Sequence, residues 1–218
     1  MIWNKRNVKA LLFDLDGTIV DSKEAYIEAA KEAFKMIGME LPNLQTAFDI
    51  PRKIEQSLSI SDIVQKDLPT FLDVYLKTYY EATKTRTKPI PNVQSALRVL
   101  AKSSKLALVT MRFVSKATII EELERLGLAG YFAYVMTALD TPKPKPSPES
   151  LIKTAEALNV DMHKCAIVGD SITDMQAGKS AGALTCAVLS GLYSREELCR
   201  TKPDLILKDA TELPSFFQ

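Results

Sequence analysis

An apolar run that ends abruptly in two carboxylates and a Gly-Thr pair is the feature that most constrains this chain. The stretch is LLFDLDGTIVDS, residues 11–22. Continuous apolar runs are typical of parallel strands covered on both faces, and ligands of such sheets bind outside the carboxyl ends of the strands. Since residues two apart can point the same way and Gly17 lets the backbone turn, Asp14 and Asp16 are expected to face one small volume. An isolated Asp-Gly would more simply be a turn or a helix cap.

Three later stretches also place polar side chains at the ends of apolar runs or before helices. Residues 105–109 lead into Thr110, and residues 165–169 lead into Asp170 and Asp174. Between them, residues 141–149 form a loop with four prolines and two lysines. Taken alone, each has an ordinary explanation, because β-branched residues favour strands, an Asp commonly caps a helix, and proline-rich loops are often solvated connectors.

Taken in this order, the four stretches resemble the motifs of the haloacid dehalogenase-like hydrolase superfamily, in its phosphatase branch. DLDGT (14–18) resembles the first motif, Thr110 the second, KPSP (145–148) the third and GDSITD (169–174) the fourth. The forms Asp-Gly-Thr-x-x-Asp-Ser and Gly-Asp-Ser-x-x-Asp look most like phosphoglycolate phosphatases and related pyrophosphatases. The resemblance therefore implies a phosphatase that hydrolyses a small phosphorylated metabolite.

The resemblance also implies a role for each matched residue. Asp14 would be the nucleophile that forms an aspartyl-phosphate, and Asp16 the general acid and base. Mg²⁺ would lie between the Asp14 carboxylate and the Asp16 backbone carbonyl, facing Asp170 and Asp174, since hard cations take oxygen ligands. The phosphoryl group would be bound by the three remaining positions: Thr110, the backbone amide of Met111 and Lys145.

Two positions need an argument of their own. Many phosphatases of this branch follow the motif Thr with Asn, but here Met111 and Arg112 follow it, so the contact of an Asn side chain is missing. In the proline-rich loop Lys143 and Lys145 are both followed by proline. Ser147 is a good helix cap and Pro148 suits a first helical turn, which favours Lys145 as the lysine beside the nucleophile.

The same patterns predict the fold class and the domains. We expect an α/β protein with a doubly wound parallel sheet, formed by residues 1–20 and 89–218. Residues 21–88 show no convincing strand pattern, and the prolines of residues 89–91 mark where the chain returns. This region is expected to be an inserted helical cap domain, as in the family it resembles. An ordinary α/β domain with helical excursions is the alternative.

Within the cap region the sequence suggests one candidate for substrate recognition. Pro51 is expected to open a short helix with Ile54 and Leu58 on one face. Arg52 and Lys53 would then lie at the start of that helix, as candidates to bind a distal carboxylate or phosphate of the substrate. Two charges on a helix are more often simply a solvated face.

Composition limits the other possibilities. The chain has 218 residues, a hydrophobic fraction of 46% and a formal net charge of +1, which gives no field to attract nucleic acid or an anionic membrane. The three cysteines show no metal-ligand spacing and are expected to be reduced. The first residues, Met1–Arg6, do not resemble an export signal, and no run is long enough to span a membrane. We therefore expect a cytoplasmic monomer or homodimer.

Three alternative functions remain open at this point. A sugar phosphomutase of the same superfamily would return the phosphoryl group to a sugar instead of to water. A receiver-like signalling domain also holds an aspartyl-phosphate with clustered Asp, Thr, Lys and Mg²⁺, although Asp16-Gly17-Thr18 and the cap region argue against it. A binding protein that kept the fold without catalysis is the third.

Overall fold

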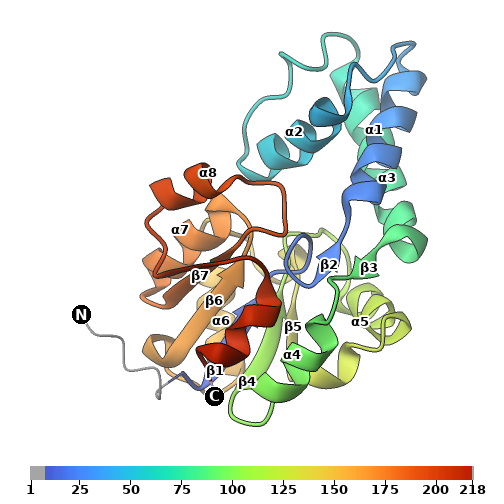
Figure 1. Cartoon of the computed structure of the whole chain (residues 1–218). Coiled ribbons are helices and arrows are strands. Elements are labelled where there is room, and N and C mark those ends of the chain that lie inside the picture. Colours follow the sequence, from blue (N-terminus) through green and yellow to red (C-terminus); the bar gives the residue numbers. More distant parts are fainter. Residues whose placement is uncertain (1–7, 218) are drawn as a thin grey trace. The chain divides into compact units, whose positions relative to one another are not determined.

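The computed structural model describes residues 8–217, so the segment Met1–Arg6 lies outside the described residues. The chain divides into two compact units (Figure 1). One unit joins the residues up to Val20 with those from Pro89 onward, and the other is Asp21–Lys88. The two-stranded pair of β2 (Val20–Asp21) and β3 (Lys88–Pro89) forms where the chain leaves the larger unit and returns to it.

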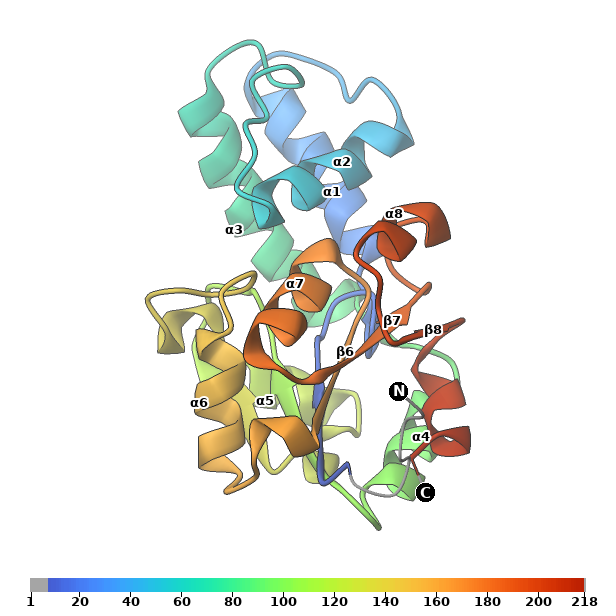
Figure 2. The ribbon, with the colours of Figure 1, turned by 90° about the vertical axis from the view of Figure 1, so that its left-hand side faces the viewer.

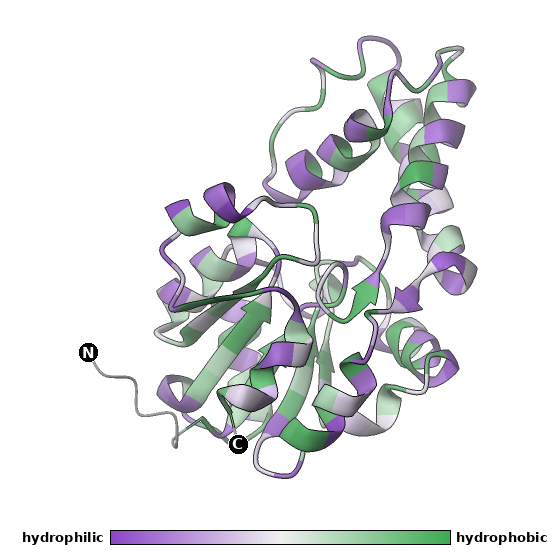
Figure 3. Cartoon of the chain, viewed as in Figure 1, coloured by the Kyte–Doolittle hydropathy of each residue, from purple (hydrophilic) through white to green (hydrophobic). Residues whose placement is uncertain are grey.

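The larger unit is built on a six-stranded sheet in the order β5-β4-β1-β6-β7-β8. Every neighbouring pair is parallel, which confirms the predicted sheet. The strands are β1 (Ala10–Phe13), β4 (Lys105–Val109), β5 (Tyr134–Met136), β6 (Cys165–Gly169), β7 (Leu184–Val188) and β8 (Leu205–Leu207). The green colour of the strands in Figure 3 reflects the apolar runs from which they were predicted.

Helices cover both faces of this sheet, as a doubly wound fold requires. Leu11 and Phe13 of β1 pack with α4 (Val93–Leu100), α5 (Lys116–Arg125) and the C-terminal 3₁₀ segment η5 (Ala210–Ser215). Ala10 and Leu12 point the other way, toward α6 (Glu149–Ala157) and α7 (Ile172–Ala181). Figure 2 shows α4 and α6 on opposite sides of the sheet. The alternation along one buried strand therefore supplies two separate apolar layers.

Strand order places the ends of three strands around one point. The chain runs from β1 to β4 and β5 on one side, and then returns to β6 on the other side of β1. In register, Leu12 of β1 lies between Ala107 of β4 and Ile167 of β6. Ligands of open α/β sheets bind where the strand order reverses in this way. Asp14, Thr110 and Asp170 each follow the carboxyl end of one of these strands.

The smaller unit is helical, with α1 (Lys23–Met36), α2 (Leu44–Glu55) and α3 (Leu68–Arg86). Its core is an apolar cluster that includes Phe34, Ile50 and Phe71, all fully buried. The rings of Phe34 and Phe71 meet edge to face with centroids 5.0 Å apart. This is a favourable aromatic geometry, so the unit has a core of its own.

The position of α2 differs from the sequence-based expectation. The helix begins seven residues before Pro51, because the Asn43 side chain accepts a hydrogen bond from the Thr46 amide at 2.9 Å and so caps the helix. Pro51 lies inside the helix, where it leaves one backbone hydrogen bond unmade. Arg52 and Lys53 consequently lie in the last turn, so their predicted place at a helix start is wrong.

Two smaller differences concern helix caps and helices that were not foreseen. Helix α6 starts at Glu149, after Pro148, and Ser147 makes only a local bond from the Glu149 amide at 3.3 Å. Asn92 precedes α4 but makes no capping bond with its side chain, whereas the Ser115 side chain caps α5. Helix α8 (Arg195–Arg200) was not anticipated. Among residues 8–217, no helix is both long and apolar enough to cross a membrane.

Candidate active site

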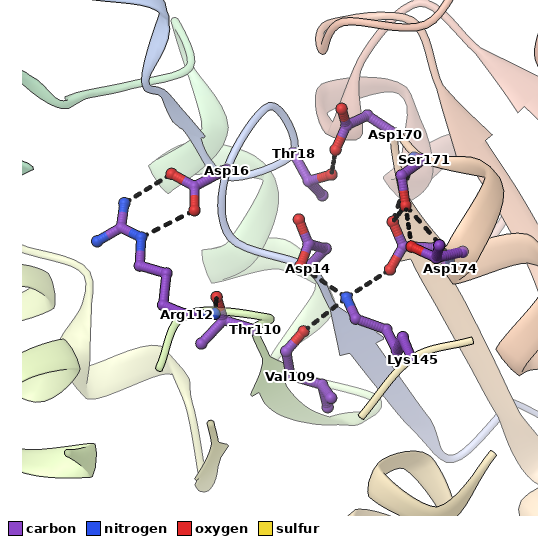
Figure 4. A network of polar contacts seen from close by, with 11 residues as sticks. Asp14, Asp16, Thr18, Val109, Thr110, Arg112, Lys145, Asp170, Ser171 and Asp174 are labelled. Atoms are coloured by element: carbon purple, nitrogen blue, oxygen red, sulfur yellow. Dashed lines mark hydrogen bonds and ion pairs between the residues drawn. The ribbon is translucent and has the colours of Figure 1, made fainter. Parts of the chain in front are cut away.

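Lys145 joins two of the acidic residues that the sequence placed at different strand ends. Its Nζ atom lies 2.7 Å from Asp14 Oδ1, 2.5 Å from Asp174 Oδ1 and 3.0 Å from the carbonyl oxygen of Val109 (Figure 4). An ammonium group has three N–H donors, so these contacts use all of them. Lys145 is 3% exposed, whereas Lys143 is exposed to solvent.

The charges of this group perturb one another. Burial raises the pKa of Asp14 from its ordinary value of 3.8 to about 8, with Lys145 opposing that rise and Asp174 adding to it. Burial alone would lower the pKa of Lys145, but the attraction of Asp14 and Asp174 outweighs burial and raises it. Lys145 is therefore a permanent cation between two acids, and a further positive charge beside Asp14 would favour its ionised form.

The Asp170 carboxylate accepts hydrogen bonds from the first motif and from the loop after β7. Thr18 Oγ1 donates to its Oδ1 at 3.1 Å, and the Leu192 amide donates to its Oδ2 at 3.4 Å. The loop comes so close that a Cβ on Gly191 would lie 1.6 Å from Asp170 Oδ2. Gly17 has a φ of +77°, and a Cβ there would lie 2.6 Å from the same oxygen. Both glycines therefore leave room for the Asp170 carboxylate.

Three carboxylates gather into a group that fits a divalent cation. Each of Asp14, Asp170 and Asp174 offers an oxygen, and these atoms lie within 4.8 Å of one another. Asp174 is oriented by Ser171, whose Oγ donates to Oδ2 at 2.6 Å. Three carboxylates against the single ammonium of Lys145 leave two negative charges when all are ionised. An all-oxygen donor set with that excess suits Mg²⁺.

Asp16 has a different environment from Asp14, although only one residue separates them. Arg112 Nε donates to its Oδ2 at 2.8 Å, and Arg112 Nη2 donates to its Oδ1 at 2.6 Å (Figure 4). The carboxylate of Asp16 does not belong to the cluster of three carboxylates described above. Its backbone carbonyl is therefore the atom left for the predicted metal contact. From the sequence, Arg112 was noted only because Met111 and Arg112 follow Thr110 in place of an Asn. No role was predicted for it.

The remaining predicted residues fall into two groups. Thr110 is 3% exposed, and its Oγ1 accepts a hydrogen bond from the Arg112 amide at 3.2 Å, so the loop through Met111 curls around this hydroxyl. Arg52 and Lys53 belong to the smaller unit. There Arg52 pairs with Asp49 at 3.4 Å, and Lys53 pairs with Asp62 at 2.5 Å.

Comparison with known proteins identifies the family. The model of the haloacid dehalogenase-like hydrolase family matches residues 11–188, which include the whole constellation from Asp14 to Asp174. The chain belongs to this family. A phosphoglycolate phosphatase from Aquifex aeolicus is 32% identical over 212 residues, covering 94% of this chain and 95% of that protein. The pyrophosphatase PpaX of Bacillus pumilus is 27% identical, covering 96% of each chain.

Solved structures agree on the fold. A haloacid dehalogenase-like hydrolase from Streptococcus pneumoniae superposes with a TM-score of 0.81 at 22% identity, covering 97% of this chain and 99% of the other. The family model and the relatives named above place the protein in the phosphoglycolate phosphatase-like branch of the family. The protein is therefore an enzyme of the phosphatase type.

Proposed function

We propose that this enzyme is a Mg²⁺-dependent phosphatase that hydrolyses a small phosphorylated metabolite through an aspartyl-phosphate. The supporting observation is the bridge that Lys145 makes between Asp14 and Asp174. Lys145 places a fixed positive charge beside the carboxylate of Asp14, the proposed nucleophile at the end of β1. Phosphoryl transfer depends mainly on such positioning and charge stabilisation. The similarity to phosphoglycolate phosphatase and pyrophosphatase PpaX favours a small phosphate ester or pyrophosphate as substrate.

In the first step Asp14 attacks phosphorus, and the bond from phosphorus to the leaving oxygen breaks. Asp16 donates a proton to that oxygen. Thr110, the Met111 amide and Lys145 bind the oxygens of the transferring group. In the second step water attacks the aspartyl-phosphate, Asp16 accepts its proton, and orthophosphate leaves with Asp14 restored as a carboxylate. This sequence assigns different tasks to the two acids.

Asp14, Asp170 and Asp174, with the Asp16 carbonyl, would hold Mg²⁺. When bound, the ion supplies positive charge that keeps Asp14 ionised and stabilises the phosphoryl oxygens. Thr18 and Ser171 serve this site by fixing the orientation of Asp170 and Asp174.

The first test is hydrolysis of p-nitrophenyl phosphate with and without Mg²⁺, comparing the parent with Asp14→Asn. The substitution removes the nucleophile at constant volume, so we expect turnover to be abolished while the thermal melt remains cooperative. Asp73→Asn, at an exposed position of α3, is the matched control and should keep parental turnover. Activity of Asp14→Asn within about tenfold of the parent, or about 1.4 kcal/mol of barrier, would refute the assignment.

We further propose that the smaller unit selects the substrate, with Arg52 and Lys53 as candidates to bind a second anionic group. The double variant Arg52→Gln with Lys53→Gln is expected to raise KM for 2-phosphoglycolate and pyrophosphate but not for p-nitrophenyl phosphate, which has no second anion. Unchanged KM values and an unchanged order of substrates would exclude this pair. The double variant Lys77→Gln with Lys84→Gln, at exposed positions of α3, removes the same charge as a control.

A further inference from the structure

The acid/base candidate Asp16 belongs to a group of three charged side chains, with Arg112 and Glu122. The Arg112 side chain is 4% exposed, and its guanidinium lies between Asp16 and Glu122 of α5. It meets both oxygens of Asp16, at 2.8 and 2.6 Å. Arg112 Nη1 donates to Glu122 Oε2, and Nη2 lies 3.5 Å from Glu122 Oε1. Arg112 therefore contacts two carboxylates at the same time.

Packing alone does not explain why Glu122 is at this place. The side chains of Ile119 and Leu123 on the same helix enter the apolar core, but Glu122 is a carboxylate only 6% exposed. Buried acids are rare unless paired. A buried ion pair is also weak support for stability, since apolar residues of similar volume often serve as well. A role in holding Arg112 in one orientation accounts for a buried acid here.

The form of the contact matters as much as its charge. A guanidinium is a planar fork whose parallel N–H groups match a carboxylate, so it fixes the plane of that carboxylate as well as its position. A lysine would supply the charge without the fork. Each Asp16 oxygen accepts one of the two Arg112 bonds. The contact thus fixes the orientation of the carboxylate.

We infer that Arg112, held by Glu122, is a positioning residue that orients Asp16 for the hydrolysis of the aspartyl-phosphate. The inference rests on the proposed function. In that step the water oxygen bonds to phosphorus, its proton passes to an Asp16 oxygen, and the bond from phosphorus to Asp14 breaks. Asp16 must be an oriented acceptor at this moment, and the two Arg112 bonds fix the position and the plane of its carboxylate. Loss of the fork therefore slows the second step more than the first.

Pre-steady-state turnover of p-nitrophenyl phosphate tests this step directly. Nitrophenolate is a good leaving group that needs little help from an acid, so formation of the aspartyl-phosphate should stay fast in Arg112→Met. We expect kcat to fall about 100-fold, the scale of losing a residue that orients a reacting group. We also expect a nitrophenolate burst equal to the enzyme concentration, because the phosphorylated enzyme accumulates. Arg112→Lys should show the same burst.

Two comparisons separate positioning from folding. Arg112→Met combined with Glu122→Met removes both buried charges, so it should regain part of the stability lost in Arg112→Met while turnover stays about 100-fold low. Arg125→Met, at an exposed position of the same helix, is the control and should behave as the parent. A fall in kcat without a burst, parental turnover in Arg112→Lys, or recovery of turnover in the double variant would each overturn the inference.

A stability cycle tests, without any catalytic assay, the contact between Arg112 and Asp16 on which the inference rests. Unfolding in urea is measured for Arg112→Met, Asp16→Asn and the two combined. Since the side chains are in direct contact, the combined loss should be smaller than the sum of the single losses. Additive losses would overturn the proposed orientation of Asp16. A parent without phosphatase activity would instead refute the proposed function, and the cycle would still decide whether Arg112 and Asp16 act as one unit.

Discussion

Replacing Lys145 tests the charge arrangement of the candidate site most directly. Lys145→Met keeps most of the side-chain volume but removes an ammonium that contacts Asp14, Asp174 and the Val109 carbonyl. Losing one preorganised charge donor costs about 3–4 kcal/mol of transition-state stabilisation, or roughly 10²–10³ in kcat. Lys143→Met removes the same charge from an exposed position two residues away, where a cation contributes less than about 1 kcal/mol.

The same substitution has a distinct effect on stability. Breaking a buried ion pair by removing one partner costs about 3–5 kcal/mol, because the other charge stays buried. Here the loss should lie at the low end, since the pKa of Asp14 is already raised to about 8 and this group can take up a proton. For a unit of this size, about 3 kcal/mol lowers Tm by roughly 6–12 °C.

The assay compares kcat and Tm for the parent, Lys145→Met and Lys143→Met, with and without Mg²⁺. We expect Mg²⁺ to raise the Tm of Lys145→Met more than that of the parent, because a cation would then replace the missing positive charge between the carboxylates. Two results would refute the reasoning. One is a larger loss of turnover in Lys143→Met than in Lys145→Met, and the other is a Tm of Lys145→Met equal to the parent's.

Three further predictions concern the carboxylate cluster. Gly191→Ala should raise the Mg²⁺ concentration needed for half-maximal activity, because its Cβ would displace Asp170, whereas Gly130→Ala meets no atom within 4 Å and should not. Ser171→Ala should lower stability by about 1 kcal/mol in urea unfolding, because it removes the cap of α7, and should weaken Mg²⁺ activation through Asp174. Titration with Mg²⁺ should raise the Tm of the parent but not of Asp170→Ala, and equal shifts would contradict the metal assignment.

The sheet and the core of the site could be predicted because their signals are local. Residues 11–13, 105–109 and 165–169 are apolar runs that end in polar side chains, and parallel strands bring such ends to one edge. Helix α2 was misplaced because a proline was taken as a start signal, while Asn43 made the stronger cap. The contact of Arg112 with Asp16 joins residues 96 apart, and no spacing rule along the chain indicates such a pair.

The proposed mechanism gives different tasks to two acids that are two residues apart, and the structure gives each of them its own cation. Asp14 meets Lys145 from the loop before α6, on the side of Asp174, while Asp16 meets Arg112 from the loop after β4. The first group has three carboxylates and one ammonium, an excess of negative charge that suits a metal ion, whereas in the second Arg112 pairs with both Asp16 and Glu122. Because the two cations come from different loops, each carboxylate has its own charged partner for the task that the proposed mechanism gives it. The separation of the two cations is therefore testable: Arg112→Met should keep the parent's dependence of activity on Mg²⁺ concentration, and Lys145→Met should change it.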